Sequence, residues 1–93
     1  MSQEPKLEKT IYTREYAAVL RLFKKAREDA GVTQVELAKR LGQTQSFVSK
    51  VERGDRRLDI IQLRTILSVF GVSLPDFVTN LEHELGSGKE PET

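Results

Sequence analysis

Residues 33–54 read TQVELAKRLGQTQSFVSKVERG and carry the clearest structural signals of the sequence. It holds two short segments, 34–41 and 45–53, each preceded by a threonine and followed by a glycine. A threonine side chain accepts hydrogen bonds from the free amides at a helix N-terminus, and glycine adopts the left-handed conformation that ends a helix. The stretch therefore predicts two short helices joined by a turn of about three residues, which forces them to cross at a steep angle.

The two predicted helices have an apolar side that holds them together. Thr33 and Glu36 form the pattern of a capping box at the start of the first helix. Ala38 is small enough to lie where the helices touch, and Gly42 permits a turn that a Cβ atom would obstruct. This arrangement leaves one face of the second helix polar and outward. The side chains expected to face inward are Val35, Leu37, Ala38, Leu41, Val48 and Val51.

The outward face of segment 45–53 carries short polar side chains that suit the edges of DNA bases. An α-helix fits the major groove of B-DNA, where glutamine bonds adenine through two hydrogen bonds and lysine donates to guanine. Each polar residue taken singly also fits a solvated helix surface, and Phe47 suits either a thymine methyl contact or partly covered packing. The candidate base contacts are Thr44, Gln45, Ser46, Phe47, Ser49 and Lys50.

Positive charge is concentrated in the same part of the chain. Residues 21–57 carry ten basic and five acidic side chains, whereas residues 58–93 carry two basic and six acidic ones. A basic middle is typical of a chain that faces a polyanion, although an unevenly charged solvated surface gives the same counts. Base readers surrounded by phosphate binders are what a DNA-reading protein requires. The candidate phosphate contacts among these cations are Lys39, Arg40, Arg53, Arg56 and Arg57.

Three further helices are predicted by apolar periodicity and by start and stop residues. No segment alternates between apolar and polar residues for long enough to indicate a strand. The expected fold class is all-α, a five-helix domain over residues 13–85, with a flexible arm over 1–12 and a disordered tail over 86–93. The three outer helices are expected over residues 14–30, 60–70 and 74–85, after the capping residues Thr13, Asp59 and Ser73.

Composition excludes several other classes of protein. Ninety-three residues suffice for one compact domain. The chain has no cysteine, which excludes disulfides and thiolate metal sites and fits a reducing, cytoplasmic setting. Its single histidine, His83, cannot form a metal site alone. Its longest uncharged run reaches only about half a membrane span. No Gly-rich phosphate loop, nucleophile with a base or carboxylate cluster is evident, so no enzyme, cofactor, metal or small-molecule ligand is expected.

The motif TQxxLAxxLGxxQSxVSxxExG over residues 33–54 resembles the Cro/phage-repressor helix-turn-helix family, also called XRE-like. The resemblance extends over roughly residues 16–85. It implies a five-helix, lambda-repressor-like domain whose ligand is operator DNA and which usually forms a symmetric dimer.

The resemblance also implies roles for single positions. Gln34 matches the phosphate-binding glutamine of the family. Gln45 and Ser46 match its principal base readers, and Lys50 matches a third base-facing position. The two residues that match an ion bridge between the first and third helices are Arg27 and Glu52.

We therefore expect a sequence-specific transcriptional regulator, a repressor that binds a pseudo-palindromic operator as a homodimer. One recognition helix reads only a few base pairs, and a two-fold axis doubles the contact. The alternative is an antitoxin of the same fold, whose toxin-binding segment would come from residues 1–12 or 86–93. The fifth helix is the best candidate for the dimer interface, and its apolar residues can complete the core, form the interface, or do both: Phe77, Leu81 and Leu85.

Overall fold

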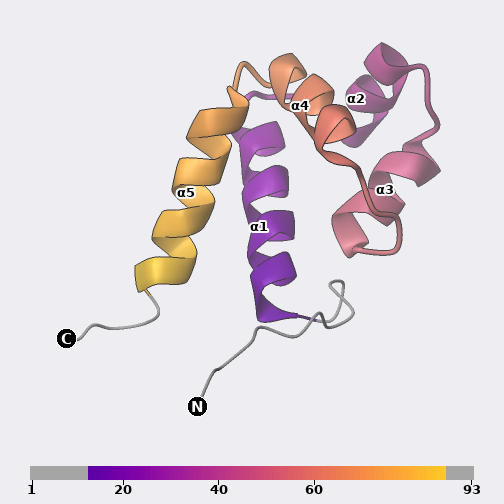
Figure 1. Ribbon diagram of the computed structural model, residues 1–93. Helices are drawn as coiled ribbons and strands as arrows, with labels where there is room; N and C mark the ends of the chain where they lie inside the picture. The colour runs from indigo at the N-terminus through magenta and orange to yellow at the C-terminus, as the bar shows by residue number, and fades with distance from the viewer. Residues whose placement is uncertain (1–12, 88–93) are drawn as a thin grey trace.

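The computed structural model describes residues 13–87, which form five α-helices and no strand (Figure 1). The predicted all-α class with five helices is confirmed for this part of the chain. The arm predicted over residues 1–12 and the tail residues 88–93 lie outside the described residues. The helices are α1 (Arg14–Asp29), α2 (Gln34–Leu41), α3 (Gln45–Arg53), α4 (Ile60–Val69) and α5 (Leu74–Ser87).

Each helix begins where a predicted capping side chain accepts a hydrogen bond from a backbone amide three residues later. At α2 Glu36 completes the predicted capping box, because its carboxylate accepts a hydrogen bond of 2.9 Å from the backbone amide of Thr33. The same hydrogen bond lowers the pKa of Glu36. The five capping residues are Thr13, Thr33, Thr44, Asp59 and Ser73.

Two glycines end the central helices as the sequence predicted. Gly42 and Gly54 cap α2 and α3 in the left-handed conformation, with φ of 66° and 84°. At Gly54 there is a second reason for glycine, since a Cβ atom there would lie 3.1 Å from Cδ1 of Leu20 on α1. The end of α3 therefore packs closely against α1.

The helices pack around one core, with α1 in the middle. Helices α1 and α5 lie side by side, α2 and α3 lie on the other side of α1, and α4 connects the two groups (Figure 1). The rings of Phe23 and Phe70 meet edge to face, with their centroids 5.6 Å apart. The largest fully buried side chains come from α1, α2, α3 and α4: Phe23, Leu37, Val48 and Leu67.

The structure corrects several details of the sequence-based prediction. Val35 is 45% exposed instead of buried. Phe77 is 3% exposed and belongs to the core of the protomer, so it is not free to contact a second copy. Helix α5 continues to Ser87, beyond the predicted end at Leu85, within the one or two residues by which helix ends commonly differ.

Candidate nucleic-acid interface

The face of α3 that points away from the core carries three of the predicted base readers. Val48 and Val51 are 1% and 2% exposed and hold the inward side of the helix. Gln45, Ser46 and Lys50 are exposed to solvent. Helix α3 is therefore fixed by its apolar side with its polar side turned outward, as a helix that enters a DNA groove must be.

Two other predicted base readers have their hydroxyls engaged within the protein. The Thr44 hydroxyl caps α3 by accepting a hydrogen bond of 3.1 Å from the backbone amide of Phe47. Ser49 is half-buried, and its Oγ accepts a hydrogen bond of 2.8 Å from Nη1 of Arg53. Nε of Arg53 also donates to Asp55 at 3.1 Å. These residues lie at the α3 surface, but their polar groups already have partners.

Phe47 lies at the edge of this surface and packs inward. Its side chain is half-buried and packs against the core. The guanidinium carbon of Arg56 lies 5.0 Å from the centroid of the Phe47 ring, close enough for a cation–π interaction. These surroundings match partly covered packing, and the thymine methyl contact stays a prediction.

A buried ion pair joins α3 to α1 behind the polar face. Nε of Arg27 donates to Oε2 of Glu52 at 2.6 Å, and Nη2 donates to Oε1 at 3.1 Å. A third hydrogen bond, of 2.8 Å, runs from Nη1 of Arg27 to the carbonyl oxygen of Val32. The hydrogen bonds to Glu52 raise the pKa of Arg27. This is the ion bridge between the first and third helices that the resemblance implied.

Two glutamines extend the ion pair to the surface. Nε2 of Gln34 donates to Oε1 of Glu52 at 3.0 Å, and Nε2 of Gln45 donates to Oε1 of Gln34 at 3.4 Å. Gln34 and Gln45 are the first residues of α2 and α3, so their hydrogen bond joins the two helix N-termini. The sequence indicated a role for each glutamine but not this link, which depends on how α2 and α3 cross.

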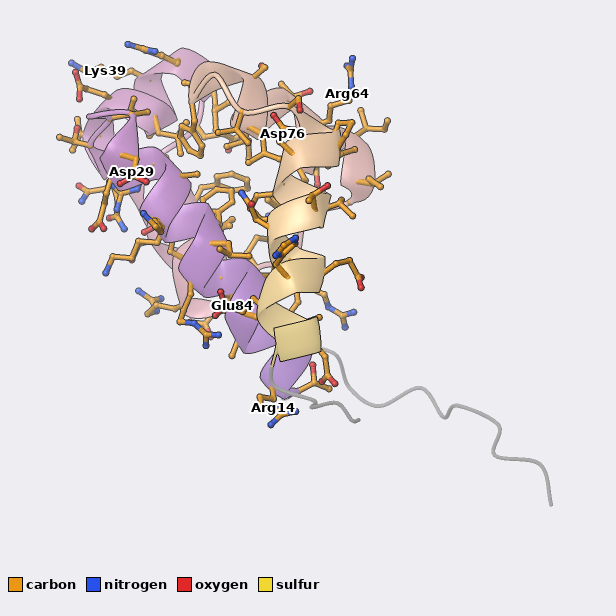
Figure 2. All side chains as sticks on the ribbon, turned by 90° about the vertical axis from the view of Figure 1, so that its left-hand side faces the viewer. Arg14, Asp29, Lys39, Arg64, Asp76 and Glu84 are labelled. Carbon is orange, nitrogen blue, oxygen red and sulfur yellow. The ribbon has the colours of Figure 1, made fainter. Side chains whose placement is uncertain are left out.

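Exposed cations flank α3. They come from the last turn of α2, the end of α3 and the loop between α3 and α4. In Figure 2 Lys39 projects into solvent, whereas the acidic residues Asp76 and Glu84 lie on α5. The cations that flank α3 therefore lie on other elements than these two acidic residues. The exposed cations among the predicted phosphate contacts are Lys39, Arg40, Arg53, Arg56 and Arg57.

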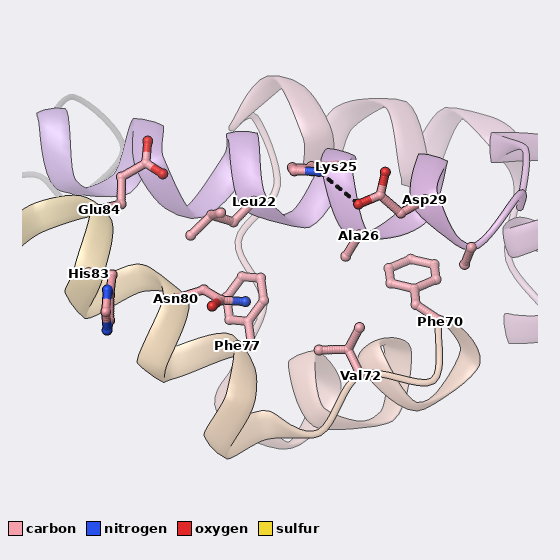
Figure 3. A pocket seen from close by; sticks show the side chains of 11 residues that line it. Leu22, Lys25, Ala26, Asp29, Phe70, Val72, Phe77, Asn80, His83 and Glu84 are labelled. Carbon is pink, nitrogen blue, oxygen red and sulfur yellow. Dashed lines mark hydrogen bonds and ion pairs between the residues drawn. The ribbon is translucent and has the colours of Figure 1, made fainter.

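A cavity of about 610 Å³ lies between α1 and α5 (Figure 3). Its apolar lining includes Leu22, Phe70 and Phe77, and the Lys25–Asp29 ion pair of 2.8 Å also borders it. None of the predicted DNA contacts lines this cavity. It is therefore separate from the α3 surface.

Within residues 13–87, no group of three or more histidine, aspartate or glutamate side chains is arranged to hold a metal ion. No single helix in this range has the length and apolar character to span a membrane, and α4 and α5 meet those criteria only as a pair bent by 103°.

Comparisons with known proteins agree with this architecture. The model of the helix-turn-helix family matches residues 23–77, which include α2, α3 and the turn between them. The uncharacterized HTH-type transcriptional regulator y4dJ of Sinorhizobium fredii is 37% identical over 57 residues, which are 61% of this chain and 74% of that protein. The solved structure of an XRE-family like protein from Pseudomonas syringae pv. tomato is 45% identical. It superposes with a TM-score of 0.73, covering 82% of this chain and 93% of the other.

Proposed function

This chain belongs to the XRE-type helix-turn-helix family of transcriptional regulators, and we propose that it is a repressor that binds a pseudo-palindromic operator as a homodimer. A DNA-binding regulator acts by occupying a site, so the chain is not an enzyme. The observation that carries the proposal is the polar face of α3, where Gln45, Ser46 and Lys50 are exposed beside a group of cations. We refer to α3 as the recognition helix.

Sequence preference is proposed to centre on Gln45, with Ser46 and Lys50 beside it. A glutamine amide matches the edge of adenine, and a lysine ammonium donates to guanine. The hydrogen bonds from Gln45 to Gln34 and from Gln34 to Glu52 restrain the Gln45 side chain before DNA arrives. A side chain that is already oriented loses less conformational entropy when it binds.

Phosphate contacts are proposed to position the recognition helix on the duplex. Gln34 begins α2, where free backbone amides and the helix dipole favour an anion. Lys39 and Arg40 are exposed at the other end of α2, and Arg56 and Arg57 are exposed in the loop after α3. Contacts of this kind fix register and orientation on DNA, and they carry no sequence information by themselves.

The dimer and the repressor action are proposed from the size of the reading surface. A single recognition helix reads too few base pairs to find one site among the competing sites of a genome. A two-fold dimer reads two half-sites about one helical turn apart and therefore selects a pseudo-palindrome. A dimer that occupies two successive major grooves blocks other proteins from the same DNA, which is the physical basis for proposing repression.

Selection of bound fragments from random duplex DNA tests the proposed function. We expect the full chain to enrich two inverted copies of one short motif, with centres about 10 base pairs apart. Transcription in vitro from a promoter that overlaps the selected site should then fall as protein is added. Failure to enrich any motif, or enrichment of a single unrepeated motif, would contradict the proposal.

A further inference from the structure

Two adjacent isoleucines in the first turn of α4 remain in solvent. Ile60 is 63% exposed and Ile61 is 67% exposed, although isoleucine is among the side chains most often buried. Ile60 shares a helix face with Leu67, about two turns later, which is fully buried. The apolar face of α4 is therefore covered by the protomer at one end and open at the other.

Each isoleucine borders an apolar cavity at the surface. Ile61 lines a cavity of about 200 Å³ together with Phe47 and Leu58. Ile60 lines another, of about 260 Å³, together with Val51 and again Leu58. Two projecting side chains and two hollows thus lie next to one another. We call Ile60, Ile61 and these two cavities the isoleucine face.

We infer that the isoleucine face is the surface through which two copies of this chain form the homodimer. The inference rests on the proposed function for its expectation of a dimer. A two-fold interface pairs a surface with itself, so the same patch must offer both projections and hollows. The isoleucine face offers both, and pairing it would remove two large apolar side chains of each copy from water.

The position of the isoleucine face suits a dimer that reads DNA. Phe47 and Val51 belong to α3, so both cavities adjoin the recognition helix itself. A two-fold axis through this face brings the two recognition helices near each other. Reading two successive major grooves requires them to be about 34 Å apart.

Helix α5, which the sequence suggested as the interface, offers less apolar surface to a second copy. It lies on the far side of α1 from α3 (Figure 1), so an axis through α5 would lie farther from the recognition helices. Phe77 is buried, Leu81 and Leu85 are half-buried, and Val78 is 42% exposed. The proposed interface therefore moves from α5 to the isoleucine face.

The polar surroundings of the isoleucine face also favour a second copy as the partner. Arg57 and Asp59 precede the isoleucines, Arg64 follows about one turn later, and all three are exposed. When a surface with both signs of charge pairs with itself, its cations can face the anions of the other copy. A partner with one sign of charge would leave some of these three charges unmatched.

Sedimentation of the full chain with Ile60→Gln together with Ile61→Gln tests the interface. Both positions are exposed and glutamine is neutral, so the fold and the attraction to phosphates should be kept. We expect self-association to weaken by at least about tenfold, with an unchanged circular dichroism spectrum and unchanged affinity for a single half-site. Val78→Gln, which changes an exposed apolar residue of α5, is the matched control and should leave self-association unchanged.

The same proteins are compared on DNA that carries one or two half-sites. Loss of self-association in the double variant, either in solution or as cooperativity between half-sites, supports the interface. The interface would be overturned if the double variant kept both self-association in solution and cooperativity between half-sites. It would also be overturned if the wild type showed neither property, or if Val78→Gln lost them equally. Sedimentation needs no DNA, so a dimer that the double variant splits but that binds no duplex supports the interface and contradicts the proposed function. Selective operator binding by a dimer that survives the substitutions contradicts the interface and supports the proposed function.

Discussion

Arg27 on α1 and Glu52 on α3 form an ion pair in which Nε lies 2.6 Å from Oε2. The two side chains are 9% and 5% exposed, so neither charge has water as an alternative partner. Glu52 also accepts a hydrogen bond from Gln34, which in turn accepts one from Gln45. The pair that fixes the recognition helix to the core is thus the same pair that restrains its first side chain.

Replacing Glu52 by alanine should strongly destabilise the fold. The change leaves the Arg27 guanidinium buried without its anion, and breaking a buried pair in this way costs about 3–5 kcal/mol. Urea denaturation followed by circular dichroism measures the loss. Asp29→Ala, which removes the exposed Lys25–Asp29 pair, is the control and should hardly change the midpoint. Equal midpoints for the two variants would show that the buried pair does not hold α3 in place.

Binding of operator DNA should depend strongly on salt. The cations around α3 are expected to displace counterions from phosphates, and about 6–10 contacts per dimer weaken binding by roughly 10³–10⁵-fold between about 50 and 200 mM salt. Fluorescence anisotropy with labelled operator measures this dependence. An affinity that stays constant over this range would argue against any binding of the DNA backbone.

Arg40→Ala should weaken binding to all DNA sequences alike. Arg40 is exposed in the last turn of α2 and is expected to contact a phosphate. The slope of log K against log salt should become shallower by about 1 for each contact removed. Lys25→Ala removes an equal charge beside the α1–α5 cavity and should leave the slope unchanged. If the two variants gave the same slope, phosphate binding would not be localised at α2.

The local parts of the fold could be predicted from sequence because they depend on neighbouring residues. A cap such as Thr33 and a stop such as Gly42 act within one turn of the chain, and both are where the sequence placed them. Val35 was predicted wrongly because two residues rotate a helix by about 200°, so it points away when Leu37 points inward. Only the position of the neighbouring helices decides how wide a buried stripe is.

The parts that could not be predicted depend on how distant segments meet. Phe77, Leu81 and Leu85 form one stripe in the sequence, but the protomer buries the first and only half-covers the other two. The link from Gln34 to Gln45 likewise requires the crossing of α2 and α3. Periodicity identifies an apolar face, and packing determines which part of that face is left for a partner.

The base preferences of the wild type and of Gln45→Ala show directly whether the recognition helix reads DNA through Gln45. Each protein is used to select from random duplex DNA, with Lys39→Ala as a control that should bind more weakly but keep every preference. We expect Gln45→Ala to lose about 1–3 kcal/mol per half-site and to lose its preference at one base position while keeping the others. If Gln45→Ala bound more weakly but kept the wild-type preference at every position, Gln45 would not be a base reader, and sequence recognition through this residue would be wrong.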